Sequence, residues 1–550
     1  MNFRVEKIFN KIENKIQLKE IAKKIFIIFM IFQPLLDVYM VLFDDKIQIL
    51  GVSLATIFRF CIVAIITIFT MIYARKNKST KFFIGYGILV CIYCIFHHIT
   101  ANKFTVNLNP TAVYNPLGEI LYILRLCIPI ALIYSIYNIK IEYKDIKKIV
   151  IGVVSIISLI ILVSNLLKIS YVSYSLDNNV IKDNMFSWFG EEKYNYYWKD
   201  LTSRGFFRSG NQLSGILVLL LPIMVYVAVK EKKIINWIIL LMQLITMVNI
   251  STRVSVVGGI AVVLMMMAFI AFDRILKNIK GIDIQKILQK AKKQLKNFIP
   301  SILIISMTIL IVYISPFNMR YKTGEMNLDM ISNNEVINNV NLNNNIIENT
   351  EDDNPKERDE DKLEYIKANH STSGVQPYYI IEKYPYTQDV EFWYDVLINV
   401  PYHKKSDNRG IRSLLMKRIY ELNNNSMDKF FGTSFTRLSS FVWPERDYES
   451  QFYSLGICGI LLFISPYFII LFFGAFMVLK NIKSDFNIKN ITYIISLALI
   501  LMIGYFSGHV MNEIFVLVFI SFVAGIILNN GMEKVKSHNN KDDKCRKLNA

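Results

Sequence analysis

The chain has 550 residues, of which 53% are hydrophobic and 19% are charged, and its mean hydropathy is +0.35. This composition excludes an ordinary water-soluble surface. The formal net charge of +18 could indicate nucleic-acid binding, but the basic residues lie in short segments between apolar runs and form no soluble basic face. The six cysteines include five within apolar runs, which excludes an extracellular disulfide framework.

Long apolar runs recur along the chain, and each could cross a hydrocarbon core of about 30 Å as a helix rising about 1.5 Å per residue. Because lipid offers no hydrogen-bond partners, the backbone there must satisfy its own polar groups, as a helix does. The pattern therefore predicts an all-α polytopic membrane protein with about twelve transmembrane helices. The predicted spans are residues 24–43, 48–73, 81–98, 117–137, 147–168, 206–229, 233–250, 253–273, 298–316, 451–480, 488–505 and 508–529.

The connectors between these runs alternate in charge. Basic residues gather in residues 1–23, 75–81, 140–148, 230–233, 274–296, 480–489 and 530–550, whereas the intervening short loops hold few. Because cytoplasmic loops carry the excess of lysine and arginine, both termini and these connectors are expected in the cytoplasm. The first apolar run follows the amphipathic segment 1–23 without a small-residue cleavage site, which predicts a retained span.

Two segments on the opposite, extracytoplasmic side are long: residues 169–205 and 317–450. Within the second, residues 333–365 are rich in asparagine and acidic side chains, so we expect a disordered insert whose deletion is tolerated. The rest of the 317–450 loop has aromatic residues and helical periodicity. It should therefore fold over the membrane and form a site with the bundle of residues 24–316 and 451–529.

Arginines at the predicted outer ends of the spans are candidates for a binding site. Arg204 and Arg208 stand at the start of the sixth span and Arg253 at the start of the eighth, while Arg125 lies about two turns inside the fourth. Arg412 begins an amphipathic stretch of the large loop. Guanidinium groups bind phosphate oxygens bidentately, so this set suits an anionic, lipid-linked diphosphate. Alternatively, an arginine at a helix end reaches lipid headgroups, which fits Arg125 less well because of its depth.

Other polar residues within the spans have structural explanations. Arg59, in the middle of the second span, could form a structural ion pair with Asp37 of the first. Cys91 and Cys94 form a CxxC, but a metal site needs further ligands, and both lie in an apolar run, so we interpret them as packing residues.

Three residues on the outer side could act as a general base. Glu445 and Asp447 precede the tenth span, where a carboxylate near basic groups could accept a proton from a sugar hydroxyl; the alternative is a solvated acidic loop end. His509 lies in a short turn between the last two spans, where a histidine could shuttle a proton or be purely structural. His97 and His98 belong to no motif, and we assign them structural roles.

Several short motifs follow one another on the predicted outer side. They are IFQPLLDVYM from residue 31, RGFFRSGNQLSG from 204, STRVSVVGG from 251, RSLLMKRIYELNNNSMDKFFGTSF from 412, ERDYESQFYSLGICG from 445 and YFSGHVMNEIF from 505. In their order and placement, the chain resembles the O-antigen ligase and O-antigen polymerase family of bacterial polytopic membrane glycosyltransferases, of the Gram-positive type. The insert at 333–365 has no counterpart in that resemblance.

The resemblance implies a GT-C-like fold in the bacterial plasma membrane, with the active face extracytoplasmic. It implies a polyprenyl-diphosphate-linked oligosaccharide donor and a glycan acceptor, with no metal, cofactor or nucleic acid. Membrane lipid, a flippase and a chain-length regulator are the implied partners.

The resemblance also assigns residue roles. Arg204 or Arg208, together with Arg253 and Arg412, would bind the diphosphate, while a base activates the acceptor hydroxyl for displacement with inversion. Many ligases of the family carry a histidine just before the tenth span. Glu445 and Asp447 stand there in this chain, which favours a polymerase over a lipid-core ligase.

Two other classes of function are compatible with the sequence. A transporter could bind the same lipid-linked glycan without reacting, although no internal repeat of the kind transporters use is evident. A membrane scaffold or sensor could bind a partner through the large outer loop. Only an enzyme would release free polyprenyl diphosphate from the donor.

Overall fold

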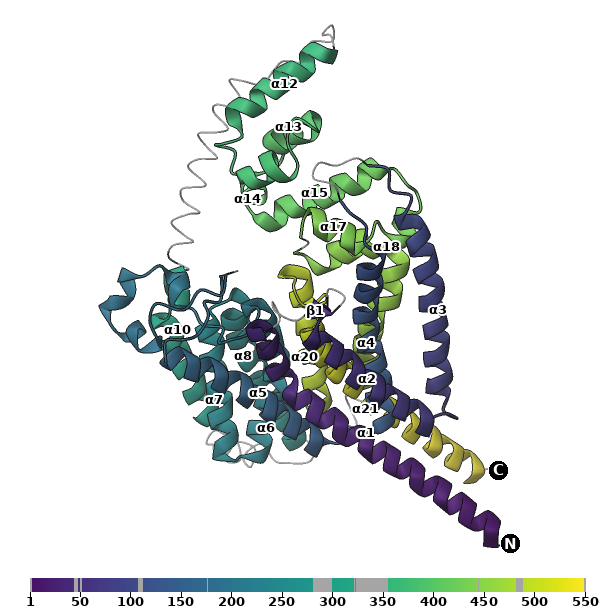
Figure 1. Cartoon of the computed structure of the whole chain (residues 1–550). Helices are drawn as coiled ribbons and strands as arrows, with labels where there is room; N and C mark the ends of the chain where they lie inside the picture. The colour runs from purple at the N-terminus through teal and green to yellow at the C-terminus, as the bar shows by residue number, and fades with distance from the viewer. Residues whose placement is uncertain are drawn as a thin grey trace. The chain divides into compact units, whose positions relative to one another are not determined.

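A computed structural model describes the chain as two compact units (Figure 1). Unit 1 comprises Met1–Gly87, Arg125–Arg320 and Ser465–Ala550, and unit 2 comprises Ile88–Leu124 and Tyr321–Ile464. The residues described are 2–43, 48–49, 52–106, 112–175, 177–279, 299–320, 322, 355–443, 445–480 and 488–548. Most of the insert predicted to be disordered, 333–354, therefore lies outside the described residues. Its described part, 355–365, is helical and belongs to α12, so the prediction of disorder was wrong there.

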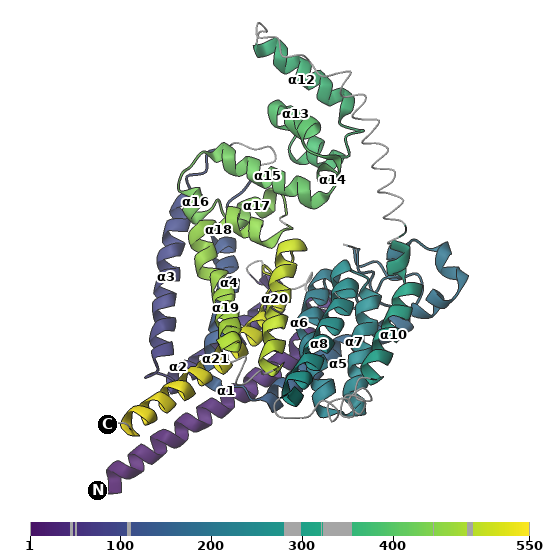
Figure 2. The ribbon, with the colours of Figure 1, turned by 180° about the vertical axis from the view of Figure 1, so that it is seen from behind.

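Unit 1 is a bundle of apolar helices (Figure 2). It contains α1 (Asn2–Phe43), α2 (Leu54–Tyr73), α5 (Tyr143–Leu166), α6 (Gly210–Glu231), α7 (Ile234–Ile250), α8 (Arg253–Ile279), α10 (Ile299–Ile314), α19 (Ser465–Lys480), α20 (Ile488–Phe506) and α21 (Ile514–Leu548). The helices α3 (Lys78–Ala101) and α4 (Pro116–Ile139) are each divided between the two units.

The helices confirm an all-α polytopic membrane protein. Among the described residues, ten helices are long and apolar enough to cross a membrane, and Ile234–Ile250 and Ile302–Ile314 are shorter apolar helices. Three predicted spans begin too early. Residues 48–53 hold the short antiparallel strands β1 (Gln48–Ile49) and β2 (Val52–Ser53), and the sixth and twelfth spans start only at Gly210 and Ile514, after turns.

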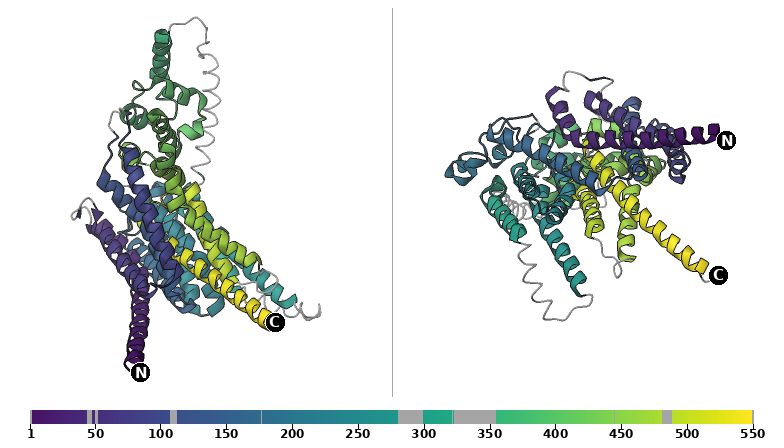
Figure 3. Two further views of the ribbon diagram at one scale, coloured as in Figure 1. Left: turned by 90° about the vertical axis from the view of Figure 1, so that its right-hand side faces the viewer. Right: turned by 90° about the horizontal axis from the view of Figure 1, so that it is seen from below.

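Helix α6 forms the centre of unit 1. It contacts α7, α8 and α20, and nearly all of its side chains are buried, as expected for a helix that is apolar on every face. Its carbonyl at Leu217 accepts a hydrogen bond of 2.9 Å from Nε2 of Gln243 in α7. By contrast, α2 and α10 leave many large apolar side chains exposed, as lipid contact requires. The start of α1 and the end of α21 project from the same side of unit 1 (Figure 3).

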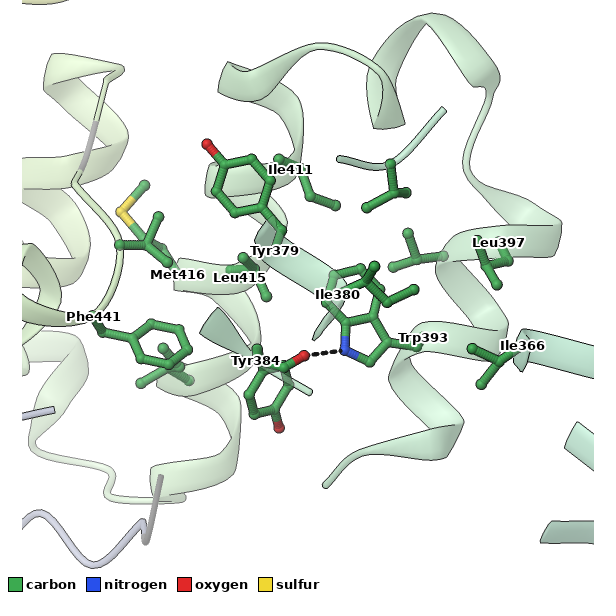
Figure 4. Close-up of a cluster of buried hydrophobic side chains, with 14 of the residues drawn as sticks. Ile366, Tyr379, Ile380, Tyr384, Trp393, Leu397, Ile411, Leu415, Met416 and Phe441 are labelled. Carbon is green, nitrogen blue, oxygen red and sulfur yellow. Dashed lines mark hydrogen bonds between the residues drawn. The ribbon is translucent and has the colours of Figure 1, made fainter. Parts of the chain in front are cut away.

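Unit 2 is built around its own hydrophobic core. Its elements are α12 (Pro355–Asn369), a π-helical turn (Tyr378–Lys383), α13 (Val390–Asn399), α14 (Tyr402–Lys405), α15 (Asn408–Asn423), α16 (Asp428–Phe431), α17 (Phe435–Phe441) and α18 (Asp447–Phe463). Figure 4 shows Trp393 beside Ile380, with its indole Nε1 donating to the Tyr384 carbonyl oxygen at 2.8 Å, in a buried cluster that also includes Leu415 and Phe441. The predicted helical and aromatic loop thus folds, and its compact unit extends beyond 317–450 to include residues 88–124 and 451–464.

Two glycines bring the 430–434 turn against the backbone of α18. Gly432 and Gly456 both have positive φ, at 77° and 67°, and Gly456 breaks the helical geometry of α18. Carbonyl oxygens near that break accept from the turn: Thr433 N donates to Tyr453 at 2.8 Å, and Ser434 N donates to Ser454 at 3.1 Å. A Cβ on Gly432 would collide with the Ser454 carbonyl, and one on Gly456 with the Phe430 carbonyl. Glycine is therefore required at both positions.

Candidate functional site

In unit 1, the loop before α6 is organised by Arg204. Its Nη2 donates to the Ser175 carbonyl oxygen at 3.0 Å and to Asn178 Oδ1 at 2.7 Å, and its Nη1 donates to the Arg208 carbonyl. The side chain is 3% exposed, and burial lowers the pKa of its guanidinium below the ordinary value. Arg204 therefore connects Ser175 and Asn178 to Arg208. Both of its terminal nitrogens are used in these hydrogen bonds, so few of its donors remain for a ligand.

Asp37 of α1 ties this loop to the bundle. Its Oδ2 accepts from the backbone N–H of Arg208 at 3.1 Å, and the charges of Arg59 and Glu513 also act on it. Arg59 is fully buried; its Nε donates to Gln33 Oε1 at 2.9 Å, and its guanidinium lies 5.7 Å from the Phe515 ring centroid. The Arg59–Asp37 association predicted from sequence is thus electrostatic, within a buried network that includes Gln33.

Arg208 and Arg253 are exposed at neighbouring helix starts in unit 1. Arg208 lies two residues before α6, and Arg253 is the first residue of α8, which packs along α6. The hydroxyls of Ser214 and Thr252 hydrogen-bond at 2.6 Å and hold the two helix starts together. Unlike Arg204, these arginines present their charge to the surroundings.

A third arginine, Arg320, was not identified from the sequence. Its Nη1 donates to the Ser251 carbonyl oxygen at 3.3 Å and to the Tyr174 hydroxyl. Its guanidinium lies 4.9 Å from the ring centroids of both Tyr174 and Trp198. Because Ser251 is two residues from Arg253, Arg320 adds a positive charge at the same end of unit 1. In the sequence, the only feature that could have indicated Arg320 is its position just after an apolar run.

Two further predicted site residues belong to unit 1. Arg125 is half-buried on α4. His509 lies in the turn between α20 and α21, half-buried and with a φ of 60°. That same turn contains Glu513, whose charge acts on Asp37, so His509 belongs to the end of the bundle that carries Arg208.

In unit 2, Arg412 and Glu445 form a linked cluster. Glu445 is within ion-pair distance of two arginines, with Oε2 3.1 Å from Arg409 Nε and Oε1 2.8 Å from Arg412 Nη1. Arg412 also donates through Nε to the Tyr379 hydroxyl at 2.7 Å and through Nη1 to the Trp443 carbonyl oxygen at 3.2 Å. The guanidinium predicted to bind diphosphate is therefore ion-paired with a carboxylate predicted to act as a base, which it shares with Arg409.

Asp447 and Glu449 occupy the first turn of α18. Asp447 is 1% exposed, whereas Glu449 accepts hydrogen bonds from the Ser413 hydroxyl and, at 3.0 Å, from Arg446 Nη1. Acidic side chains stabilise a helix N-terminus because they face the positive end of its dipole. Of the two neighbouring acids predicted as base candidates, Glu445 is thus ion-paired and Asp447 is enclosed.

A buried carboxylate in unit 2 escaped the sequence analysis. Glu119, 1% exposed, accepts from the backbone N–H groups of Phe435 and Thr436 at 2.9 Å each and from the Thr436 hydroxyl at 2.9 Å. It also lies 3.0 Å from His97 Nε2, and His97 Nδ1 is 2.5 Å from the Phe431 carbonyl oxygen. Glu119 thus places a negative charge at the N-terminus of α17. His97 is hydrogen-bonded between Glu119 and the Phe431 carbonyl, which is a structural role.

Within the described part of the chain, no group of three or more His, Cys, Asp or Glu side chains could hold a metal ion. Cys91 is exposed and Cys94 partly so, and neither belongs to such a group.

The apolar bundle and its exposed arginines define a polytopic membrane protein with cationic groups at one end of its helices. The chain belongs to the family described as O-antigen ligase like membrane protein, whose family model matches residues 19–534. Family membership makes it a membrane glycan ligase or polymerase of glycosyltransferase type, active in polysaccharide biosynthesis. No curated protein and no solved structure matches it significantly.

Proposed function

We propose that this protein is a polysaccharide polymerase that takes glycan from a polyprenyl-diphosphate carrier and transfers it to a glycan acceptor on the extracytoplasmic face. The observation that carries the proposal is the pair of exposed guanidinium groups, Arg208 and Arg253, on helix starts joined by the Ser214–Thr252 hydrogen bond. Arg320 adds a third positive charge beside Ser251. A lipid-borne diphosphate is the anionic substrate that such a membrane-embedded group suits.

The reaction needs charge stabilisation more than covalent help from the protein. The acceptor hydroxyl oxygen attacks the anomeric carbon, the bond from that carbon to the carrier phosphate oxygen breaks, and the configuration inverts. Polyprenyl diphosphate departs with the bonding electron pair, while a base takes the hydroxyl proton. Guanidinium groups fixed in advance stabilise the negative charge that develops on the diphosphate, and this step requires no metal.

The contacts of the proposed diphosphate-binding arginines suggest different roles for them. Arg208 and Arg253 are assigned direct binding, and Arg204 a positioning role because its donors are bound to Ser175, Asn178 and Arg208. Arg125 is retained as a ligand from within its span. Arg412 is ion-paired with Glu445, which it shares with Arg409, so a diphosphate there would compete with that carboxylate.

Among the base candidates, the contacts favour His509. Glu445 is held by two arginines, and this attraction makes a carboxylate a weaker base. Asp447 is almost fully enclosed. We therefore expect His509→Ala to lower the transfer rate by at least about 100-fold, within the range for loss of a general base, and Glu445→Gln to keep most of it. Initial rates of carrier release measure both, and the reverse ranking would assign the base to Glu445.

Reconstitution tests the function as a whole. The purified chain, placed in liposomes with a polyprenyl-diphosphate-linked oligosaccharide, should produce a ladder of longer glycans and free polyprenyl diphosphate. EDTA should leave the rate unchanged. A correctly inserted protein that leaves glycan length and carrier unaltered would instead be a transporter or a scaffold, and transfer only to a lipid-core acceptor would make it a ligase.

A further inference from the structure

The long loop between α5 and α6 contains a short amphipathic turn, the 3₁₀ helix Met185–Phe189. Phe186 and Phe189 are 64% and 70% exposed, whereas Ser187 and Trp188 between them are buried. Side chains three residues apart lie on the same side of a 3₁₀ helix, so the two phenyl rings form one exposed apolar face. Such a face is unfavourable in water, which indicates that something covers it.

The turn is held against the bundle on both sides. The backbone N–H of Met185 donates to Oδ1 of Asn165, in the last turn of α5, at 2.9 Å. On the other side, Lys193 Nζ donates to the Trp188 carbonyl oxygen at 3.0 Å and to that of Ile314, the last residue of α10, at 3.3 Å (Figure 1). The turn therefore lies across the ends of two apolar helices.

The surfaces of these two helices that continue to the turn are apolar and exposed. Leu159, Val163 and Leu166 follow one side of α5 and are 39–50% exposed. Because α5 is long and apolar enough to cross a membrane, this side contacts lipid. Asn184 donates to the Leu166 carbonyl oxygen at 3.4 Å, so the phenyl face begins where this lipid-facing side ends. Next to the other attachment point, Tyr313 of α10 is 69% exposed.

The charges around the turn do not select an anionic partner. The stretch from Asp177 to Lys199 contains three lysines and four acids, and Lys168 at the end of α5 is ion-paired with Asp183 at 2.7 Å. Glu191 and Glu192 follow the turn and are exposed. Since carboxylates strongly disfavour the hydrocarbon region, these two acids limit how deeply the turn could enter a membrane. Any attraction to lipid must therefore come from the phenyl rings.

We propose that Phe186 and Phe189 anchor this loop in the boundary between headgroups and acyl chains of the leaflet at which α5 and α10 end. Amphipathic segments bind membranes in this way, with aromatic side chains at the apolar boundary and charged groups in water. A second copy of the chain is a poorer occupant. Two phenyl rings would contribute about 500 Å² at most, less than the roughly 800 Å² per partner that a standard protein interface buries.

The anchor would also set the depth of a cation. The same loop carries Trp198, whose ring centroid lies 4.9 Å from the Arg320 guanidinium. A loop fixed at the lipid boundary would keep Arg320 at the level of the headgroups, where the diphosphate of a lipid carrier lies. This consequence rests on the proposed function, whereas the anchor itself does not.

Spin labels on the full chain in phosphatidylcholine nanodiscs test the proposal. The six native cysteines are first replaced by alanine, and Phe186→Cys, Phe189→Cys and Glu192→Cys are then labelled one at a time. Collisions with oxygen, which concentrates among acyl chains, are compared with collisions with a nickel chelate, which stays in water. We expect oxygen to dominate several-fold at 186 and 189, as at a label on the lipid-facing Val163, and the nickel chelate to dominate at 192.

The same measurements can overturn the proposal. Labels at 186 and 189 that meet the nickel chelate as often as the label at 192 would place the phenyl face in water. Labels shielded from both reagents would show that protein covers the face, as in an oligomer. Adding phosphatidylglycerol should leave the collision ratios unchanged, and entry into lipid only in its presence would contradict an apolar anchor. No glycan or carrier takes part, so failure here leaves the proposed transfer reaction standing.

Discussion

Replacing Arg208 or Arg253 by alanine should each lower the rate of glycan transfer by roughly 10- to 100-fold, because a charge-assisted contact to the leaving diphosphate is worth about 1.5–3 kcal/mol. Both side chains are exposed, so neither change removes a buried contact. The melting temperature should therefore stay within about 2 °C of the wild type, as is usual for surface substitutions. Rates of carrier release in liposomes, at saturating donor, measure the effect.

Two controls separate binding from architecture. Lys182→Ala removes an exposed positive charge from the same long loop, outside the helix starts that carry Arg208 and Arg253, and should leave the rate unchanged. Arg204→Ala removes the bonds to Ser175, Asn178 and Arg208, so it should lower the thermal stability as well as the rate. If Arg208→Ala and Arg253→Ala transfer glycan at the rate of Lys182→Ala, the proposed diphosphate site does not exist.

The largest expected effect on stability is that of Glu119→Ala in unit 2. This carboxylate accepts from Phe435 N, Thr436 N and the Thr436 hydroxyl and lies beside His97. Its removal leaves these donors buried without an acceptor, at the start of a helix whose dipole the negative charge stabilised. Loss of a buried charged partner typically costs about 3–5 kcal/mol. Pulse proteolysis of the full chain across a urea series should show unit 2 cleaved at lower urea.

Matched variants test this assignment. Glu119→Gln keeps one acceptor oxygen and should be intermediate, whereas Glu382→Ala, which removes an exposed carboxylate of the same unit, should match the wild type. Equal protease resistance in Glu119→Ala and Glu382→Ala would show that the carboxylate does not support α17.

The spans could be predicted because each is a local property of the sequence: an apolar run of sufficient length between charged connectors. The exact starts of the sixth and twelfth helices could not, since a polar residue beside an apolar run fits the first turn of a helix as well as the loop before it, and tertiary contacts decide between the two. Phe207, for example, is fully buried and faces the Phe515 ring, with ring centroids 6.5 Å apart.

For the candidate site, the sequence indicates residue types but not whether each side chain is buried or exposed. Arg204 and Arg208 stand four residues apart in one motif, and only the fold shows that one is a buried scaffold and the other is exposed. Likewise, Glu119 and Thr436 are 317 residues apart in the sequence, so no local pattern could reveal that the first caps the helix of the second. Arg320 follows an apolar run, and nothing in its local sequence distinguishes it from other basic residues at the ends of spans.

The paired glycines Gly432 and Gly456 impose a mechanical constraint on unit 2. A side chain on Gly432 would collide with the backbone of Ser454, and one on Gly456 would collide with the backbone of Phe430, so the 430–434 segment and the first half of α18 are in direct backbone contact. Any rearrangement of this segment during catalysis would have to carry the first half of α18, with Glu449 and its hydrogen bond to Ser413, as one rigid part. The bend at Gly456 is then the natural pivot for such a motion, because the helix beyond it could remain fixed in the membrane.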